Sequence, residues 1–426
     1  MSRSRARTGV ACALTAILTA VVLAGAAAAL PRKLSPYHKL DIFTRVLSYV
    51  ENNYVEEVSQ EELVYGAVKG MVKTLDPHSA FLSPEEYRDM KVETEGEFGG
   101  VGIEVELRDG KLVVIAPIQG SPAAKAGLRS GDKITAIDGK STAAMSINDA
   151  VHKMRGQRGT RVRLTVERPG VGGVRDIDVV RDVIRTVAVT SRMLESGYGY
   201  VAIKQFNERV ARQLEDQLEA LEKQAGGKLR GLVLDMRGNP GGLFDQSVRV
   251  ADLFLESGII VRTVGKNGKI IDEEKARPRG THSGFPMIVL VNGGSASASE
   301  IVAGALQDHG RAVIMGTQTF GKGSVQTLIE FPQDGSALKL TIARYYTPKG
   351  RSIQERGITP DVVVEQIKAE PRPKNDREKA ERDLPGHLRN EQGAGQAAPA
   401  VVIDDHQLKT ALDYLKAWQI FRAQVK

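Results

Sequence analysis

The chain of 426 residues is almost without cysteine, since Cys12 is the only one. Cys12 lies within the apolar segment at the N-terminus, so the remainder of the chain after that segment contains no thiol. This absence excludes a cysteine nucleophile, a zinc site with cysteine ligands and any disulfide bond in that remainder. A lipoprotein attachment at Cys12 is also disfavoured, because the apolar run follows the cysteine instead of preceding it.

Histidine is scarce as well, with seven residues, and a focused basic stripe is missing. Four of the histidines, in no partner pattern, are expected to be surface or packing residues: His78, His152, His282 and His309. The net charge is +7, but the basic residues are spread among acidic ones. A nucleic-acid-binding protein would need a basic stripe, so nucleic acid is not an expected partner. The fractions of hydrophobic (41%) and charged (26%) residues are those of a globular protein.

The N-terminus has the pattern of an export segment. Arg3, Arg5 and Arg7 precede an uncharged, mostly apolar run over residues 8–31. A basic stretch followed by an apolar one is typical of a secretory signal peptide. The run is also long enough to cross a bilayer, which takes about 20 apolar residues. A cleaved signal and a retained signal anchor therefore both stay open, and the small residues at 26–29 favour cleavage.

Changes in periodicity divide the chain into six parts. They are a signal peptide or signal anchor (1–30), an N-terminal helical region (31–95), a compact β-rich unit (96–182), a core of alternating strands and helices (183–366), a flexible linker (367–400) and a C-terminal helix (401–426). The alternation in the core predicts an α/β layer around a largely parallel sheet.

Two shorter features are predicted near the ends of the chain. Asp76-Pro77 and Ser83-Pro84 interrupt the helical region, and the second pair predicts a new helix with Ser83 as its cap and Pro84 at its first position. The C-terminal helix carries an apolar face, which must be buried on the body of the protein or against another subunit. That face consists of Leu408, Leu412, Leu415 and Trp418.

The segment VLVNGGSASASEI predicts a buried strand that runs directly into a helix. This geometry would expose the Ser297 hydroxyl at the turn, beside the unpaired N–H groups and the positive end of the helix. Such donors can stabilise the negative charge that develops on a substrate carbonyl. The spacing Ser297-x-x-Glu300 is also a capping box, so this segment alone leaves open a purely structural serine.

A nucleophilic serine needs a base, and the segment TFGKGSVQ offers Lys322 between two glycines just before a strand. A lysine buried there would lose its charge, and a neutral amine could take the proton of Ser297. The alternative, a phosphate-binding loop, is disfavoured because Gly323 follows the lysine where such a loop has serine or threonine. A second glycine turn, in LVLDMRGNPGGL, could add N–H donors from Gly241 and Gly242 to that of Ala298.

Six strings in order resemble the carboxyl-terminal processing peptidases, which form serine peptidase family S41, up to about residue 365. They are FGGVGIEV, GSPAAKAGLRSGDKITAIDG, LDMRGNPGGL, GGSASASEI, TFGKGSVQ and RYYTPKGRSIQERGITPD. The resemblance implies an α/β multidomain protein with a crotonase/ClpP-like α/β peptidase core and an inserted PDZ domain at 96–182. An N-terminal helical segment and a C-terminal helical tail would complete it.

The resemblance also implies roles for individual residues. Ser297 would be the nucleophile, Lys322 the base and Gln326 the residue that orients the lysine. The oxyanion donors would be Ala298 and Gly242. Asp308 corresponds to an acid that supports the site in some relatives, with an ordinary helix-end charge as the equal alternative.

For the PDZ domain, the resemblance implies a site that binds C-terminal tails of protein substrates. Gly100, Val101 and Gly102 would contact the carboxylate, and Ile103 would line the adjacent pocket. The alternative for the glycines is a bulge or turn in a small β domain. Arg168 is a weaker candidate for signalling from this domain to the active site.

The sequence therefore predicts an exported serine endopeptidase that uses a Ser-Lys dyad to cleave or degrade proteins of the bacterial periplasm or cell envelope. The expected enzyme requires no metal or organic cofactor. Further expected partners are an adaptor protein, other copies of the chain, and the inner membrane through the N-terminal segment. Three rivals remain: a catalytically inactive PDZ scaffold on a peptidase fold, a crotonase-like enzyme acting on acyl thioesters, and a trypsin-fold PDZ protease.

Overall fold

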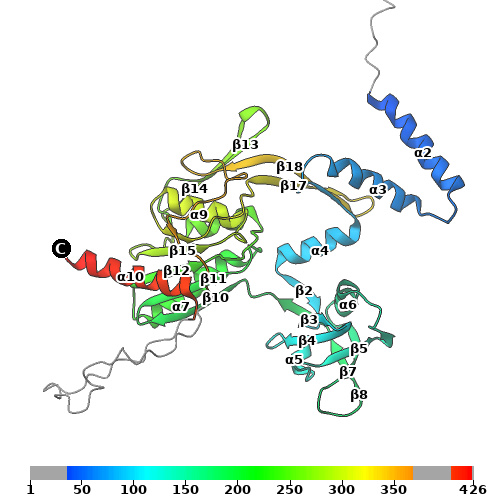
Figure 1. Ribbon diagram of the computed structural model, residues 1–426, viewed down its shortest axis with the longest axis horizontal. Coiled ribbons are helices and arrows are strands. Elements are labelled where there is room, and N and C mark those ends of the chain that lie inside the picture. Colours follow the sequence, from blue (N-terminus) through cyan, green and yellow to red (C-terminus); the bar gives the residue numbers. More distant parts are fainter. Residues whose placement is uncertain (1–35, 368–403, 425–426) are drawn as a thin grey trace, which may run out of the picture. The chain divides into compact units, whose positions relative to one another are not determined.

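The computed structural model describes residues 36–367 and 404–424 (Figure 1). The predicted signal or anchor segment at 1–30 lies outside the described residues, as does the predicted linker except for residue 367. The chain separates into two compact units, Met1–Leu75 and Asp76–Lys426. Among the described residues, no helix has the length and apolar character needed to cross a membrane.

The first unit is helical, as predicted. A short 3-10 turn η1 (Pro36–Lys39) leads into α2 (Leu40–Asn53), and α3 (Gln60–Lys73) follows. Ser59 caps α3, since its hydroxyl accepts the N–H of Glu62. No residue of α2 is buried, and Ile42, Val46 and Tyr49 are all more than half exposed.

The second unit begins with a short strand that the sequence did not predict. β1 (Ala80–Leu82) lies between the two proline-containing turns and pairs with β18 (Ser336–Tyr346). The helix α4 (Pro84–Glu95) then starts as predicted, with Ser83 as its cap and Pro84 in its first turn. The Ser83 N–H donates to Glu86, which completes a capping box.

The β-rich unit contains one sheet in the order β3-β4-β5-β7-β8, and β3 is therefore an edge strand. β6 pairs with β5, and β2 pairs separately with β9. The strands are β2 (Glu97–Gly100), β3 (Ile103–Arg108), β4 (Lys111–Pro117), β5 (Lys133–Ile137), β6 (Lys140–Ser141), β7 (Arg161–Glu167), β8 (Val174–Val180) and β9 (Asp182–Arg185). The helices are α5 (Pro122–Lys125) and α6 (Ile147–Met154).

The core contains a sheet in the order β10-β11-β12-β15-β16-β19, which is parallel except for β10 at one edge. Its strands are β10 (Val189–Glu195), β11 (Tyr198–Ile203), β12 (Gly231–Asp235), β15 (Met287–Val291), β16 (Val313–Gly316) and β19 (Val362–Val363). Both faces are covered, because Leu232 and Leu234 lie in one apolar cluster and Val233 lies in another. The prediction of a largely parallel α/β sheet is confirmed.

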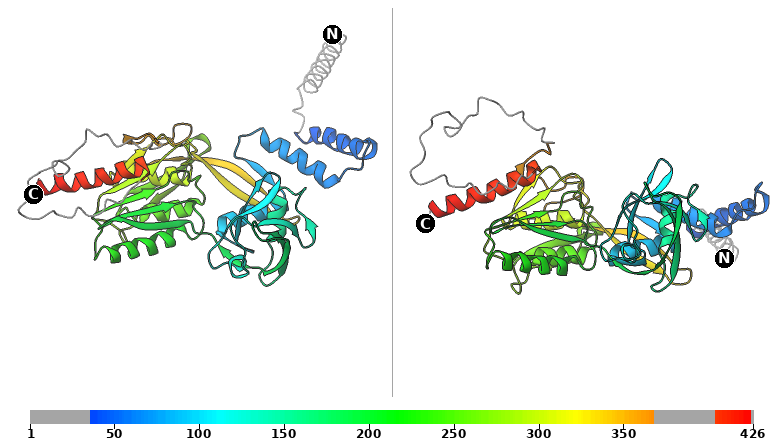
Figure 2. Two further views of the ribbon diagram at one scale, coloured as in Figure 1. Left: turned by 60° about the horizontal axis from the view of Figure 1, so that its bottom comes forward. Right: turned by 90° about the horizontal axis from the view of Figure 1, so that it is seen from below.

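Three helices cover one face of this sheet, and α10 (His406–Gln424) covers the other (Figure 2). The three are α7 (Val210–Gln224), α8 (Phe244–Asp252) and α9 (Ala298–Asp308). The side chains of Leu408, Leu412 and Leu415 are buried on the sheet, so α10 docks on its own chain. Trp418, predicted on the same face, is 41% exposed.

A second core sheet has the order β1-β18-β13-β14, and β17 (Ser324–Phe331) also pairs with β18. β13 (Ile259–Gly265) and β14 (Ile270–Lys275), which the sequence did not predict, form a hairpin through η2 (Lys266–Gly268). The β17–β18 register shifts by one residue: Val325 faces Ala343, but Gln326 faces Thr341. Such a bulge changes the direction of side chains on the bulged strand.

Candidate active site

Ser297 lies between the buried strand β15 and helix α9, as the sequence predicted. Its backbone has φ 54° and ψ −111°, a left-handed conformation that is rare for residues other than glycine. A serine in such a conformation costs on the order of 1–3 kcal/mol and persists only where neighbouring contacts impose it. The turn around Ser297 must therefore be held by strong interactions.

Glu300 supplies the strongest of these interactions. Its side chain is completely buried, and the Oε2 atom accepts the N–H of Ser297 at 2.8 Å and the N–H of Lys322 at 2.9 Å. The two amide nitrogens are thus at most 5.7 Å apart, because that is the sum of the two distances. The predicted contact between Ser297 and Glu300 is present, and it extends to the loop of Lys322.

The other oxygen of Glu300, Oε1, accepts the Thr319 hydroxyl at 2.6 Å and the Gly321 N–H at 2.7 Å. Desolvation by burial raises the pKa of Glu300, and the hydrogen bonds from Thr319, Gly321, Ser297 and Lys322 oppose that rise. The carboxyl group therefore joins the start of α9 to the loop before β17.

Asn239 joins the second glycine turn to the turn of Ser297. Its buried side chain accepts the N–H of Gly241 at 2.9 Å, and its carbonyl oxygen accepts the N–H of Ala296 at 3.0 Å. A β-carbon on Gly241 would lie 2.9 Å from the Ser297 β-carbon and 3.0 Å from the Ala298 nitrogen. Glycine at position 241 thus allows the two turns to touch.

The predicted N–H donors are available at this contact. Within the residues that the structure describes, the N–H groups of Ala298 and Gly242 have no protein acceptor. The N–H of Gly241, which the sequence offered as an alternative donor, is already bound to Asn239. Gly242 has φ 138°, and a β-carbon there would lie 2.2 Å from the Phe206 carbonyl oxygen. Ala298 and Gly242 therefore each present an N–H group without a protein acceptor among the described residues.

Lys322 is half-buried, and its loop can adopt the observed backbone conformation only with glycine on both sides of the lysine. A β-carbon on Gly323 would lie 2.4 Å from the Gln354 nitrogen, and Gly321 has φ 91°. Desolvation lowers the pKa of Lys322, the positive charge of Lys339 lowers it further, and Glu300 opposes both effects. A lowered pKa increases the fraction of neutral amine near neutral pH.

Gln326 lies four residues further along, on β17. Its Nε2 atom donates to the Ser324 hydroxyl at 2.9 Å and to the Thr341 hydroxyl at 3.2 Å. The Thr341 hydroxyl in turn donates to Asp76 Oδ1 at 3.1 Å. The structure thus places Gln326 in a network that includes the segment before β1.

His78 belongs to that segment and lies near Lys322, a proximity that the sequence pattern did not indicate. Desolvation lowers the pKa of His78, and the nearby charges of Lys322 and Lys339 lower it further. The pairing of Ala80 with Lys339 brings this histidine to the site, and a pairing over that sequence distance leaves no local signal. The other three histidines bind side chains or a carbonyl elsewhere: His152 with Glu85 and Asp89, His282 with Glu222, and His309 with Ile259.

Two residues considered from the resemblance lie away from the turn of Ser297. Asp308 is the last residue of α9, at the end opposite Ser297, where it forms an ion pair with Arg351 and accepts the N–H of Lys349. Arg168 forms a two-point ion pair with the buried Asp132 inside the β-rich unit. Both have structural partners that account for them.

The β-rich unit has a groove of about 370 Å³ between the edge strand β3 and helix α6. All four residues predicted to bind a tail line it: Gly100, Val101, Gly102 and Ile103. The remaining lining residues are mostly apolar: Phe98, Val105, Ile147, Asn148, Val151, Met154 and Arg155. Gly102 has φ 74° and its carbonyl oxygen accepts the Ser121 hydroxyl, so the loop before β3 is fixed in place.

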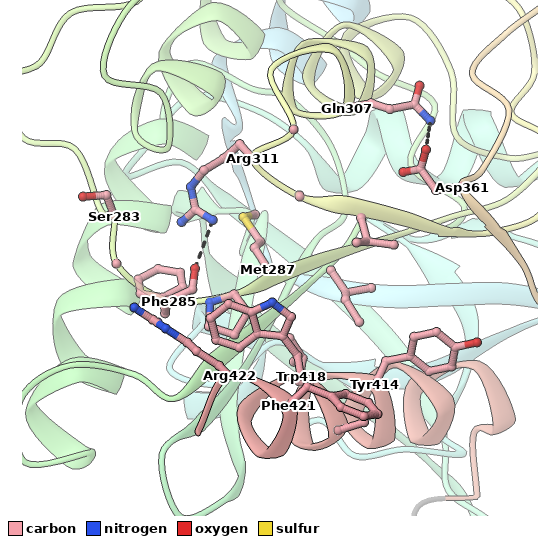
Figure 3. Close-up of a pocket in the computed structure, with 18 residues that line it drawn as sticks. Ser283, Phe285, Met287, Gln307, Arg311, Asp361, Tyr414, Trp418, Phe421 and Arg422 are labelled. Atoms are coloured by element: carbon pink, nitrogen blue, oxygen red, sulfur yellow. Dashed lines mark hydrogen bonds between the residues drawn. The ribbon is translucent and has the colours of Figure 1, made fainter. Parts of the chain in front are cut away.

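A larger cavity, of about 1140 Å³, lies under the C-terminal half of α10 (Figure 3). Trp418 and Phe421 of α10 line it together with Met287, and Arg311 binds the Phe285 carbonyl at its border. It contains none of the residues predicted to act in catalysis or tail binding. Over residues 36–367 and 404–424, no cluster of three or more His, Cys, Asp or Glu side chains could hold a metal ion.

Comparisons with known proteins identify the relatives of this chain. The sequence model described as peptidase family S41 matches residues 197–364, a PDZ domain model matches 113–168, and the model of the activating protease CtpB N-terminal domain matches 24–86. A carboxy-terminal-processing protease of Bartonella bacilliformis is 46% identical over 387 residues, 89% of this chain and 89% of that protein. Carboxy-terminal processing protease CtpA of Bacillus subtilis is 38% identical over 331 residues, 77% of this chain and 69% of that protein. The solved photosystem II D1 C-terminal processing protease is 34% identical, covers 76% of this chain and 86% of its own, and has a TM-score of 0.46.

Proposed function

This chain belongs to the carboxy-terminal processing proteases of peptidase family S41, which are serine-type peptide hydrolases, and on that premise we propose that Ser297 is its nucleophile and Lys322 its general base. One observation carries the proposal most directly. A single oxygen of Glu300 binds the N–H groups of both residues, so the two backbones are held within 5.7 Å. The lowered pKa of Lys322 supports a neutral amine that can accept the Ser297 proton.

The reaction is acyl transfer. Lys322 takes the hydroxyl proton as Ser297 attacks the peptide carbonyl, and the N–H groups of Ala298 and Gly242 stabilise the oxyanion. The protonated lysine then gives its proton to the leaving amine, and an acyl-enzyme remains. Lys322 next takes a proton from water, which attacks the ester and releases the new carboxyl terminus. Gln326 orients the amine through its side-chain oxygen.

We further propose that the groove between β3 and α6 binds the C-terminal tails of substrates. β3 is an edge strand, so an extended tail can pair with its free backbone groups. The tail carboxylate would meet the loop at Gly100, Val101 and Gly102. The apolar lining, with Ile103 and Ile147 on opposite sides, favours an apolar C-terminal side chain.

The remaining parts of the proposal concern place and partners. We propose an exported enzyme that acts on proteins of the bacterial periplasm or cell envelope, with an adaptor protein as a further partner. Self-association is supported by exposed apolar side chains on both terminal helices, among them Tyr49 of α2 and Phe421 of α10. Membrane association would depend on residues 1–30, which lie outside the described residues.

Labelling with a fluorophosphonate, which reacts only with an activated serine, tests the dyad. The wild-type protein is expected to be labelled and to cleave an unfolded protein substrate. Ser297→Ala and Lys322→Ala should both lose labelling and cleavage while retaining the wild-type circular dichroism spectrum. Cleavage by either variant would contradict the dyad. Absence of labelling in the wild type would favour the alternative, a catalytically inactive PDZ scaffold.

The tail-binding proposal has a separate test. Ile147→Glu places a charge in the apolar groove and should weaken binding of a peptide that ends in an apolar residue and a free carboxylate, as measured by fluorescence anisotropy. A C-terminally amidated peptide is the matched control and should bind weakly to the wild type. Equal binding of the two peptides would refute carboxylate recognition.

A further inference from the structure

The segment before β1 is connected to Gln326 by hydrogen bonds across two strands. Asp76 Oδ1 accepts the Thr341 hydroxyl at 3.1 Å, and the Thr341 oxygen accepts Gln326 Nε2 at 3.2 Å. The register agrees with this connection, because Thr341 faces Gln326 directly across the β17–β18 pair. The bulge that leaves Ile342 unpaired brings those two residues opposite each other.

Asp76 is itself held firmly in position. Its Oδ1 atom accepts the N–H groups of His78 and Ser79 at 2.8 and 2.9 Å, and its Oδ2 atom accepts the Ser79 hydroxyl at 2.6 Å. The Ser79 oxygen then accepts the N–H of Thr341 at 3.0 Å. Although desolvation raises the pKa of Asp76, the hydrogen bonds from Ser79, His78 and Thr341 bring it below its ordinary value, so the group is a carboxylate at neutral pH.

A carboxylate can only accept hydrogen bonds, and this fixes the direction of the whole chain of bonds. The Thr341 hydroxyl has one proton, and it must donate this proton to Asp76. Toward Gln326, the hydroxyl oxygen can therefore only accept a hydrogen bond. The amide of Gln326 must therefore present its nitrogen to Thr341, and its second N–H is taken by Ser324. Both N–H bonds of Gln326 Nε2 are thus used, one by Thr341 and one by Ser324. The Oε1 atom of Gln326 remains available as an acceptor.

We propose that Asp76 and Thr341 are positioning residues that set the direction of the Gln326 amide, so that its oxygen is offered to the amine of Lys322. The inference rests on the dyad proposed above and extends it to a segment that the resemblance left unassigned. Reversal of the amide would present an NH₂ group to the lysine, and this group could bind only the lone pair of the neutral amine, which the Ser297 proton needs. The fraction of correctly oriented neutral amine would then fall.

Thr341→Val tests the connection, because valine has nearly the shape of threonine but cannot form either hydrogen bond. The rate constant of Ser297 labelling by the fluorophosphonate should fall by about tenfold, within the range found for directly coupled residues. Thr341→Ser, which retains the hydroxyl, should restore most of the rate. Thr327→Val, on the same strand pair but outside the network, is the matched control and should label at the wild-type rate.

A double-mutant cycle with Gln326→Ala separates positioning from a general structural effect. If Thr341 acts through Gln326, Thr341→Val should change the labelling rate little when Gln326 is already alanine. An equal loss in both backgrounds would overturn the proposal, and so would a wild-type rate for Thr341→Val. Asp76→Asn tests the same connection from its other end should the valine variant not fold, and unchanged labelling of that variant would also overturn it.

The pH dependence of labelling provides a second readout. The groups facing the Lys322 amine are His78, Lys339 and Glu300, and none of them is changed by Thr341→Val. Loss of the acceptor on Gln326 should therefore lower the plateau of the labelling rate at high pH, where Lys322 is fully deprotonated, and a shift of the midpoint with an unchanged plateau would count against positioning. Labelling that survives in Lys322→Ala would instead refute the dyad itself, a result distinct from any failure of the Thr341 variants.

Discussion

Replacement of Glu300 by glutamine would show how strongly one buried group holds the two turns of the site. The carboxylate accepts four hydrogen bonds, two at each oxygen. Glutamine has almost the same shape, but one of its two terminal atoms is an NH₂ group that donates hydrogen bonds instead of accepting them. At least one buried N–H group must therefore lose its acceptor.

The orientation of the new amide decides the size of the effect. With the NH₂ group toward Thr319, the hydroxyl can rotate away and accept, so the Gly321 N–H is the one backbone donor that loses its partner. In the opposite orientation, the N–H groups of both Ser297 and Lys322 lose theirs. A buried donor without a partner costs about 1–3 kcal/mol, so the first orientation should prevail. The remaining bonds lose their charge assistance, but the cost of burying a charge is also removed.

We therefore expect Glu300→Gln to lower the free energy of unfolding by about 1–3 kcal/mol. Urea denaturation followed by fluorescence measures this change, with the exposed Glu219→Gln on α7 as the matched control. Because the Ser297 backbone is strained, the loss of hydrogen bonds that hold it should also slow fluorophosphonate labelling. The rate should fall by about tenfold for each 1.4 kcal/mol added to the activation free energy. Wild-type stability together with a wild-type labelling rate would refute this account of the site.

Three further predictions concern single residues of the core. Lys339→Gln removes a positive charge that lowers the pKa of Lys322, so the pKa of Lys322 should rise. The rising limb of the labelling rate against pH should then move to higher pH, and a limb that stays in place would count against Lys322 as the titrating base. Gly242→Ala places a β-carbon 2.2 Å from a backbone carbonyl oxygen, and cleavage of a protein substrate should be lost; undiminished cleavage would exclude this turn from the site. Arg237→Met leaves the carboxylate of Asp235 buried without its cation and should cost about 3–5 kcal/mol in urea denaturation, whereas a change below about 1 kcal/mol would show that the ion pair is solvated.

Local sequence was sufficient to predict those parts of the site that depend on neighbours along the chain. The Gly-Gly-Ser turn, the buried strand before it and the helix after it lie at the predicted positions, and Ser83-Pro84 starts α4. The contact of Ser297 with Glu300 follows from a spacing of three residues and could be predicted as well.

Contacts between distant segments could not be predicted in this way. Glu300 also binds Thr319 and Lys322, and no periodic pattern relates these positions. β1 has only three residues, too few to show a period of two, and its partner β18 begins more than 250 residues later. The positions of Asp76 near Gln326 and of His78 near Lys322 depend on that pairing, and for this reason the sequence showed no partner pattern for His78.

The open edge of β3 has a consequence for the behaviour of the protein in concentrated solution. A free strand edge can pair with any extended chain, including the same edge of another molecule, and such pairing begins aggregation. β3 carries Glu104, Glu106 and Arg108 at alternate positions, all on one face. An antiparallel pair of these strands centred on Val105 would place Glu104 of each strand opposite Glu106 of the other, and like charges directly opposite are destabilising. A pair centred on Glu106 would instead set Glu104 opposite Arg108 on both sides, so the charges of this edge select against some registers of self-pairing and not against all of them.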